Sequence, residues 1–421
     1  MTTATEAGHD HRDAADETGA ISRQEFEADA REFLKAHAAE RMEEDFVWGE
    51  GSDNVSLLPE RMPEQDLADL AVAREWARTV YDAGFGWISG PTAYGGRGLH
   101  RDYQAIYNSV ARDYDTPSMS AYGIGLGMVA PTILAHATEE VKQAYLAAMH
   151  RGDIVACQLF SEPGSGSDLA SLQTRAVKDG DEWIVNGQKV WTSGAQFSDI
   201  GEVICRTDPD LPKHRGLTGF VVDMHAPGVE VRPLRQMTGG ASFNEVFFTD
   251  VRIPDSHRLG DVNGGWTVAL TTLMNERAAI GGGGGGVGLP TTTRIIEMIR
   301  ALGRAGDPLI RQQLASVIIN ERVASYTNLR AMAKIAVGQL PGPEMSLAKL
   351  SLTANMLRTS DLVSSVLGAS ITADTGTWGT YAWSDYVLSA PGMRIAGGTD
   401  EVLRNVLGER VLGLPKEPPV A

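Results

Sequence analysis

The chain has 421 residues and a formal net charge of −17, with 43% hydrophobic and 22% charged residues. This composition is typical of a globular protein of several domains, and an acidic balance with no basic run argues against nucleic-acid binding. Two cysteines, Cys157 and Cys205, and nine scattered histidines indicate neither a disulfide framework nor a metal site.

The N-terminal third is expected to be helical after a disordered tail. Residues 1–20 are polar and acid-rich, without the apolar core of a signal peptide. From 21 to 152 the apolar residues recur with helical spacing, most clearly over 25–42, 66–85 and 139–153. The longest apolar stretch, 122–137, is too short and proline-broken for a membrane span. By elimination, the expected location is cytoplasmic.

Residues 153–262 change character and predict a central β-domain. Asp-Gly at 179–180 and Asn-Gly at 186–187 are both hairpin signals. Short runs rich in β-branched and aromatic residues alternate with turns, which favours a compact barrel or sandwich. The predicted β-rich runs cover residues 154–160, 172–191, 200–207, 216–224, 228–234 and 244–254.

Residues 263–421 return to the helical period, which predicts a C-terminal four-helix bundle. A loop rich in Gly, Trp and Tyr is expected over 370–390. The order of helices, β-domain and helices gives an α+β, multi-lobed fold class. The four long helices are predicted over 265–277, 291–305, 307–337 and 344–368.

One segment of the third region, 271–290, needs an explanation. It begins as a helix, carries Glu276 and Arg277, and then runs through six glycines, Gly281 to Gly286. Each glycine in a helix costs roughly 0.5–1 kcal/mol relative to alanine, so the run is expensive to order. A linker, a phosphate-cradling loop and a helix that something must approach closely are all open interpretations.

Two segments of the β-domain are candidate ligand loops. "SEPGSGSD", 161–168, follows a predicted strand, and Gly164 and Gly166 allow backbone amides to approach a ligand. It matches neither a Walker loop nor a Rossmann fingerprint, and a plain surface turn is an equal alternative. In "NGQKVWTSGA", 186–195, a tryptophan followed by two hydroxyl residues suits a flat heterocycle, although Trp191 taken alone is more typical of a core.

Taken together, the motifs resemble the acyl-CoA dehydrogenase family, the FAD-dependent enzymes that desaturate acyl-CoA thioesters between Cα and Cβ. The matching segments occur in the family's order, with a β-domain between helical lobes, over about 22–416. They are "SEPGSGSD", "NGQKVWTSGA", "FNEVFFTDVRIP", the "NER" that precedes the glycines, and "GGTDEVLRNVLGER".

The resemblance implies which residues bind FAD. The first loop and the tryptophan segment would cover the flavin, Ser167 would also contact the CoA part of the substrate, and two positions of "GGTDEV" would lie near the other end of the flavin. The implied FAD-binding residues are Gln158, Phe160, Ser161, Gly166, Ser167, Trp191, Thr192, Ser193, Thr399 and Glu401.

The family reaction removes an α-proton while a hydride leaves Cβ for flavin N5, so it needs a carboxylate base in a dry pocket and donors to the thioester oxygen. Much of the family places that Glu immediately before the "GT" of the C-terminal loop, where this chain has Gly397. The isovaleryl- and long-chain-type members place it in an "ER" pair on the helix after the β-domain. This resemblance assigns Glu276 as the base, although an "ER" pair alone is more typical of a solvated helix face.

The resemblance also implies a substrate site around this base. The N–H of Gly397 would polarise the thioester oxygen, and Arg277 would have a structural or anchoring role. The glycines after the base would leave room for a branched, cyclic or steroid-like acyl group, unless they form only a flexible break. The expected substrate-binding residues are Ser167, Met274, Asn275, Arg277, Gly397 and Gly398.

The chain departs from the family where one subunit normally contacts the FAD of its neighbour. Leu302 and Ala305 stand at the Arg and Phe positions of the Arg-x-x-Phe-Gly motif, and a later Gln-x-x-Gly-Gly motif is missing. Some bacterial members, including ones that act on steroid side chains, pair two unlike subunits. An α2β2 heterotetramer with a related chain and a homotetramer with substituted contacts are both open.

The expected partners are an acyl-CoA substrate and an electron-transfer flavoprotein. Two other readings stay open. One is a flavin-dependent monooxygenase of the same fold, which needs no carboxylate at 276. The other is a non-catalytic partner subunit of a heteromeric dehydrogenase.

Overall fold

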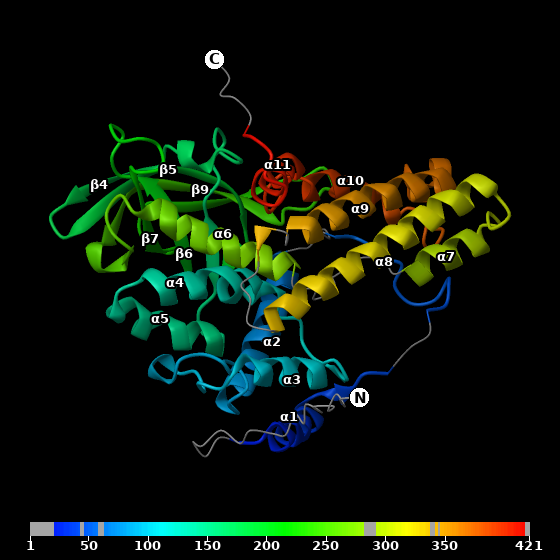
Figure 1. The fold of residues 1–421 in the computed structure, drawn as a ribbon, viewed down its shortest axis with the longest axis horizontal. Helices are drawn as coiled ribbons and strands as arrows, with labels where there is room; N and C mark the ends of the chain where they lie inside the picture. Colours follow the sequence, from blue (N-terminus) through cyan, green and yellow to red (C-terminus); the bar gives the residue numbers. More distant parts are fainter. Residues whose placement is uncertain are drawn as a thin grey trace, which may run out of the picture.

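The computed structural model describes residues 21–42, 46–57, 63–281, 292–336, 342–343 and 346–416, so the predicted tail over 1–20 lies outside the described residues. In Figure 1 the helices α1 to α5 lie below, the strands lie at the upper left, and the long helices α8 and α9 extend to the right. The α+β, multi-lobed fold class is confirmed.

The N-terminal lobe is helical, as predicted. A capping box starts α1, in which the Ser22 side chain accepts from the N–H of Glu25 and the Glu25 carboxylate accepts from the N–H of Ser22. The π-helix η3 (Gly125–Val129) leads directly into α4. The helices are α1 (Arg23–His37), α2 (Pro63–Asp82), α3 (Arg101–Ala111), α4 (Ala130–His136) and α5 (Glu139–Arg151), with a small pair of strands, β1 (Ala39–Glu40) and β2 (Tyr114–Asp115).

The middle lobe is one eight-stranded mixed sheet of order β10-β7-β6-β4-β5-β9-β8, with β3 paired in parallel to β6. Its path ends at β10 and β8, and no pairing among the described strands closes it, so the expected barrel is an open sheet. The strands are β3 (Ala156–Leu159), β4 (Arg175–Asp179), β5 (Glu182–Ser193), β6 (Ile200–Arg206), β7 (Leu217–Asp223), β8 (Val229–Leu234), β9 (Phe243–Pro254) and β10 (Arg258–Leu259).

One of the two predicted hairpins is present and the other is wrong. Asp179 pairs with Glu182 across the turn that joins β4 to β5, as expected. Asn186 and Gly187 instead lie inside β5, where the register against β9 shifts between Val185 and Gly187. A Cβ on Gly187 would lie 2.5 Å from the Thr174 side chain, so the glycine allows a close approach at a bulge rather than a turn.

The C-terminal lobe contains the four predicted helices, α6 to α9, and two shorter ones that were not predicted, α10 and α11. α10 forms where a loop was expected, because Trp383, Tyr386 and Ala390 fall at helical spacing and are buried against α7 to α9. Pro391 follows them inside the last turn. The helices are α6 (Gly265–Gly281), α7 (Thr292–Ala301), α8 (Pro308–Ala336), α9 (Ser346–Leu367), α10 (Trp383–Met393) and α11 (Asp400–Arg410).

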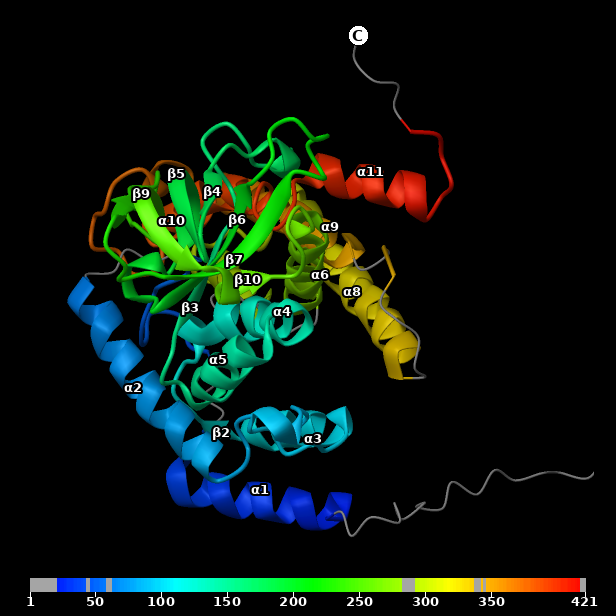
Figure 2. The ribbon, with the colours of Figure 1, turned by 90° about the vertical axis from the view of Figure 1, so that its left-hand side faces the viewer.

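Helix α6 joins the three lobes. It contacts β6 and β7 of the sheet, α4 of the N-terminal lobe and α9 of the C-terminal lobe, and Figure 2 shows it between the sheet and the long helices. The glycine run continues from Gly281, the last residue of α6, into 282–286, which lies outside the described residues. Within the described part of the chain, none of the helices has the length and apolar character needed to cross a bilayer.

Candidate active site

The turn after β3 is held from inside by a buried ion pair. Glu162 accepts from the backbone N–H groups of Gln173 (2.6 Å) and Thr174 (2.8 Å), and its Oε1 lies 2.8 Å from Nζ of the fully buried Lys189. Burial opposes ionisation of Glu162, but the Lys189 ammonium and the other donors outweigh it and hold the pKa of the carboxyl below its ordinary value. The turn is therefore fixed without a ligand.

The FAD-binding residues predicted in this segment lie on both sides of that turn. Gln158 is half-buried on β3, Phe160 is buried, and the Ser161 carbonyl accepts a 2.9 Å hydrogen bond from the backbone of β5. Gly166 and Ser167 are exposed, and a Cβ on Gly166 would meet nothing within 4 Å. The backbone at Gly166 is thus exposed, next to a turn that the Glu162–Lys189 ion pair fixes.

Trp191 and Thr192 form an unusual strand end on β5. Trp191 has a φ of 62° and 58% of its surface is exposed, whereas Thr192 is buried and its Oγ1 has no partner among the described residues. A tryptophan in the left-handed region is a backbone outlier, and such strain is typical of functional sites. Asn244 Nδ2 supports the bend by donating to the Thr192 carbonyl (3.1 Å), and Ser193 beside it is half-buried.

This pair fits the flavin that the sequence implied. An exposed aromatic ring offers a face for stacking, and the neighbouring buried hydroxyl needs a hydrogen-bond partner that the described protein does not provide. A flat heteroaromatic ring with polar atoms along its edge satisfies both residues.

On α6, Glu276 is half-buried and lies one turn after Thr272, so the two side chains share a helix face. Asn275 is half-buried and Met274 is 60% exposed. The side chain of Arg277 lies outside the described part of the structure. The predicted base therefore lies in the second half of α6, one turn after the fully buried Thr272.

That preceding turn is tied to the sheet through a residue that the sequence reasoning missed. Thr272 Oγ1 donates to Glu202 Oε1 (2.6 Å) and lies 2.9 Å from Thr132 Oγ1. Glu202 is fully buried on β6, opposite Gln158 of β3, and its Oε2 has no partner among the described residues. Burial raises the pKa of this carboxyl to about 8, although the Thr272 hydrogen bond opposes the shift.

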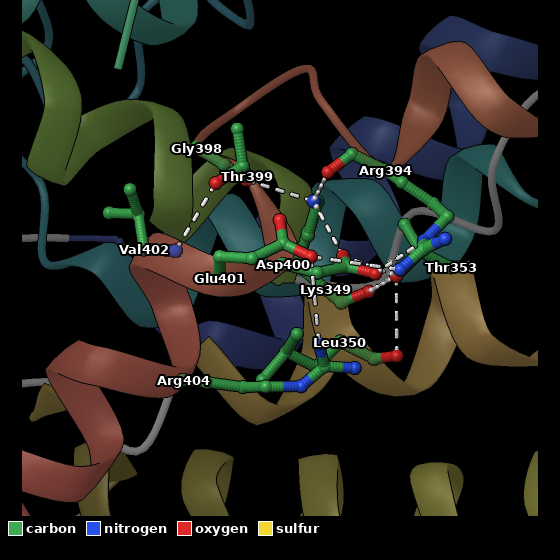
Figure 3. A network of polar contacts seen from close by, with 10 residues as sticks. All are labelled: Lys349, Leu350, Thr353, Arg394, Gly398, Thr399, Asp400, Glu401, Val402 and Arg404. Carbon is green, nitrogen blue, oxygen red and sulfur yellow. Dashed lines mark hydrogen bonds and ion pairs between the residues drawn. The ribbon is translucent and has the colours of Figure 1, made fainter. Parts of the chain in front are cut away.

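The loop before α11 is anchored by a second buried network, shown in Figure 3. Gly397 and Gly398 have φ values of 66° and 87°, which favour glycine. Lys349 Nζ of α9 donates to the carbonyls of Arg394 (2.9 Å) and Gly398 (2.8 Å) and to Asp400 Oδ1 (3.1 Å). These contacts fix the backbone on both sides of Gly397.

The two other predicted residues of this loop have structural contacts of their own. Thr399 is the N-cap of α11, where its hydroxyl accepts from the N–H of Val402 (3.2 Å). Glu401 is exposed, with its Oε1 3.9 Å from Arg394 and 3.8 Å from Arg404. Helix α9 contacts both α6, which carries Glu276, and α11. Lys349 of α9 also bonds the loop that contains Gly397.

The residues that the sequence analysis missed are polar side chains inside apolar runs. Glu202 interrupts "DIGEVIC" and Lys349 interrupts "SLAKLSL", and a charged residue in a buried run is the available signal. Their partners come from distant segments, which no local pattern identifies. Leu302 and Ala305, at the eroded inter-subunit motif, are exposed in the turn between α7 and α8.

Three domain families match the chain: the acyl-CoA dehydrogenase N-terminal domain over residues 22–153, the middle domain over 157–251 and the C-terminal domain over 263–412. The acyl-CoA dehydrogenase IpdE1 of Mycobacterium tuberculosis is 36% identical over 82% of this chain and 88% of its own length. FadE34 of the same organism is 41% identical over 86% of this chain, which spans only 47% of that longer protein.

Two solved structures have the same fold. The steroid ACAD Tcur3481–Tcur3483 superposes with a TM-score of 0.69 at 25% identity, covering 94% of this chain and 98% of the other. The ChsE4–ChsE5 complex from Mycobacterium tuberculosis superposes with a TM-score of 0.68 at 28% identity, with the same coverage.

Proposed function

Because the chain belongs to the acyl-CoA dehydrogenase family and is thus an oxidoreductase, we propose that it desaturates an acyl-CoA thioester with Glu276 as the base. The supporting observation is that two positions exchange roles. A half-buried carboxylate, Glu276, lies on α6, while the position that holds the base in much of the family is Gly397, whose backbone is in the left-handed region. A glycine there has no proton-accepting group, whereas Glu276 has one.

In this mechanism Glu276 removes the α-proton of the bound thioester, and the Gly397 N–H donates to the thioester oxygen as enolate-like charge develops. The network around Lys349 holds that donor in place before substrate arrives, so little reorganisation is needed. Met274, Asn275, Arg277 and Gly398 complete the proposed substrate site, with Ser167 towards the CoA.

FAD, when bound, supplies the acceptor for the hydride that leaves Cβ. Trp191 would stack against its ring and Thr192 would hydrogen-bond its edge, while Gln158, Phe160, Ser161, Gly166 and Ser193 would line the ring and Thr399 and Glu401 the far end. The domain boundaries 21–152, 153–262 and 263–421 and the cytoplasmic location stay predictions.

The test is Glu276→Gln, which keeps the shape of the side chain and removes its basicity. We expect enoyl-CoA formation, measured by mass with an artificial electron acceptor, to fall by about 10³-fold or more. A monooxygenase of this fold or a non-catalytic subunit predicts little effect, because neither needs a carboxylate at 276. Full activity of the variant would therefore exclude the proposal.

The same assay, run over linear, branched and steroid-derived acyl-CoA thioesters, tests the substrate class. A bulky acyl group is favoured by the steroid ACAD among the structural relatives and by the glycines after Glu276. An electron-transfer flavoprotein is the proposed physiological acceptor. A clear preference for short linear chains would contradict the bulky-substrate part alone.

We further infer that the chain works in an oligomer with a related, unlike subunit. Ile319, Val323 and Tyr326, at i, i+4 and i+7 on α8, are 59%, 57% and 64% exposed, which is typical of a helix face that another subunit covers. Two structural relatives are named as pairs of proteins. The exposed Leu302 and Ala305 leave the usual inter-subunit FAD contacts to such a partner.

The mass and flavin content of the chain purified alone decide the assembly. A heteromeric enzyme predicts little bound FAD in the isolated chain, with recovery of one FAD per active site after co-expression with a related chain that carries Arg-x-x-Phe-Gly. One FAD per chain in a homotetramer would instead support the alternative that this chain replaces those contacts itself.

A further inference from the structure

The buried carboxylic acid on β6 has no role in the mechanism above, yet it contacts the helix that carries the base. We propose that Glu202 is a positioning residue, which sets the distance between the Glu276 helix and the strands expected to hold the flavin. The inference rests on the proposed function, since it concerns the placement of that same base.

A buried hydrogen bond joins Glu202 of β6 to Thr272 of α6. Glu202 Oε1 accepts from Thr272 Oγ1 at 2.6 Å, and both residues are fully buried. Thr272 is four residues before Glu276, so its carbonyl is the helical acceptor for the Glu276 N–H and the two side chains lie on one face. A shift of Thr272 therefore moves the base.

On the sheet side of this hydrogen bond, Glu202 lies next to the strand that leads into the expected flavin segment. Glu202 and Gln158 are opposite each other in the parallel pair β3–β6, so their side chains leave the same face of the sheet. Gln158 begins the segment expected to cover the flavin. The Glu202–Thr272 contact thus connects the base helix directly to the cofactor strands.

This polar contact lies in a region where the neighbouring side chains are apolar. Its surroundings are the apolar core of Ile200, Ile204, Val221, Val268 and Ala269. A buried carboxyl there is costly unless it is hydrogen-bonded, and an apolar side chain would pack without directional preference. A short hydrogen bond fixes the helix at one rotation and one height.

Burial keeps Glu202 neutral by raising the pKa of its carboxyl. The elements packed around it contribute Thr132 and His136 from α4, Thr272 and Glu276 from α6, Gln158 from β3 and Val221 from β7. Of these side chains, only His136 and Glu276 are ionisable. His136 pairs with Thr271 at 2.8 Å, and burial lowers the pKa of its imidazole. A neutral acid can keep accepting from Thr272 without a counter-ion.

The test removes the contact from each side and separates proton abstraction from binding. Glu202→Leu removes the acceptor and Thr272→Val removes the donor. We expect each to lower kcat by about 10-fold, because small misplacements of a reacting group cost that much or more, while KM changes little. Exchange of the substrate α-proton with deuterated solvent, followed by NMR on a thioester that cannot be desaturated, should slow by the same factor.

Two controls distinguish positioning from general damage. Glu202→Gln keeps an acceptor of the same shape and should retain the wild-type rate at neutral pH. Thr132→Val removes the second side-chain partner of Thr272 but leaves the Glu202 contact, so it should have a much smaller effect on kcat. The double variant Glu202→Leu/Thr272→Val should be no slower than either single variant, because both remove one interaction.

A readout independent of turnover is amide hydrogen exchange of α6. It should rise in Glu202→Leu over 268–276 and stay unchanged in α9. Wild-type kcat and α-proton exchange in Glu202→Leu, or equal loss in Glu202→Gln and Glu202→Leu, would overturn the proposal. If the wild-type protein neither exchanges nor desaturates any acyl-CoA, the proposed function fails and this inference fails with it. If the wild type does both, a failure of the Glu202 variants to respond concerns Glu202 alone.

Discussion

At the scale of single residues, the proposed cofactor side of the site contains two neighbours with opposite environments. Trp191 is strained and exposed, and Thr192 is buried with a hydroxyl that has no partner in the part of the chain that the structure describes. An unpaired buried polar atom costs free energy in the isolated protein, and a ligand that pairs with it recovers that cost. The Thr192 hydroxyl is therefore expected to gain a partner if the flavin binds as proposed.

Thr192→Val should weaken FAD binding by about 10-fold, because it removes one hydrogen bond without changing the shape of the side chain. Fluorescence titration of the apoprotein with FAD measures this directly. Thr249→Val, at an exposed position of β9 in the same lobe, is the matched control and should bind FAD normally. Equal affinity of Thr192→Val and the wild type would show that the hydroxyl does not contact the cofactor.

Glu202 makes a pH-dependent contribution to stability whose sign follows from its environment. Burial raises the pKa of its carboxyl from the ordinary value of 4.5 to about 8 in the folded protein. Between these values the folded state holds a proton that the unfolded state has released, so stability falls as pH rises through this window. The contribution is fully present below pH 4.5 and is lost by about pH 8.

Glu202→Gln removes this titration. The free energy of unfolding of the wild type, minus that of the variant, should therefore decrease from about pH 4.5 to about pH 8 and be flat above it. Urea unfolding at a series of pH values gives the difference curve. A flat difference over the whole range would mean that Glu202 is ionised in the folded protein.

At the scale of elements, much of the fold was predictable because it follows local periodicity. The long helices α8 and α9 and the strands β6 to β9 lie where the apolar spacing indicated. Asn186–Gly187 is a bulge rather than a turn because β5 continues to pair with β9 beyond it. α10 was missed because its apolar signal is only three buried residues, Trp383, Tyr386 and Ala390, in a segment rich in loop-forming residues.

The site was predictable only in part for the same reason. Motif order indicated Trp191, Glu276 and Gly397, because these lie in contiguous segments. The contacts that support them join β6 to α6 and α9 to the loop before α11, and such long-range pairs have no local sequence signature. Thr399 has a visible local role as an N-cap in addition to its expected role near the cofactor.

The anchor of the loop before α11 makes a prediction about stability. Lys349→Met leaves the buried Asp400 with fewer partners, the Gly398 carbonyl without its side-chain donor and the Arg394 carbonyl with the Asp400 N–H alone, so the protein should lose about 3 kcal/mol or more. Urea unfolding measures the loss. Arg404→Ala, which breaks only the exposed pair with Glu401, should cost far less. Equal stability of the two variants would contradict the anchoring role.

At the scale of the whole molecule, the three lobes meet on one helix. α6 contacts the sheet, α4 and α9, and α9 also contacts α11, so the helix of the proposed base packs on the sheet of the middle lobe and on the helix that supports the proposed oxyanion loop. The exposed apolar face of α8 and the exposed Leu302, in the turn between α7 and α8, lie elsewhere in the C-terminal lobe. We therefore expect the proton abstraction to use residues of this chain alone. We expect the FAD site to be completed by residues of a partner subunit.

The most direct measurement is anaerobic mixing of the flavin-loaded protein, in its complete assembly, with an acyl-CoA thioester while the flavin absorbance is followed. We expect that the wild type bleaches in a single turnover, that Glu276→Gln binds the thioester but does not bleach, and that Arg404→Ala behaves as the wild type. Bleaching of Glu276→Gln at the wild-type rate would contradict the assignment of Glu276 as the base and with it the proposed function.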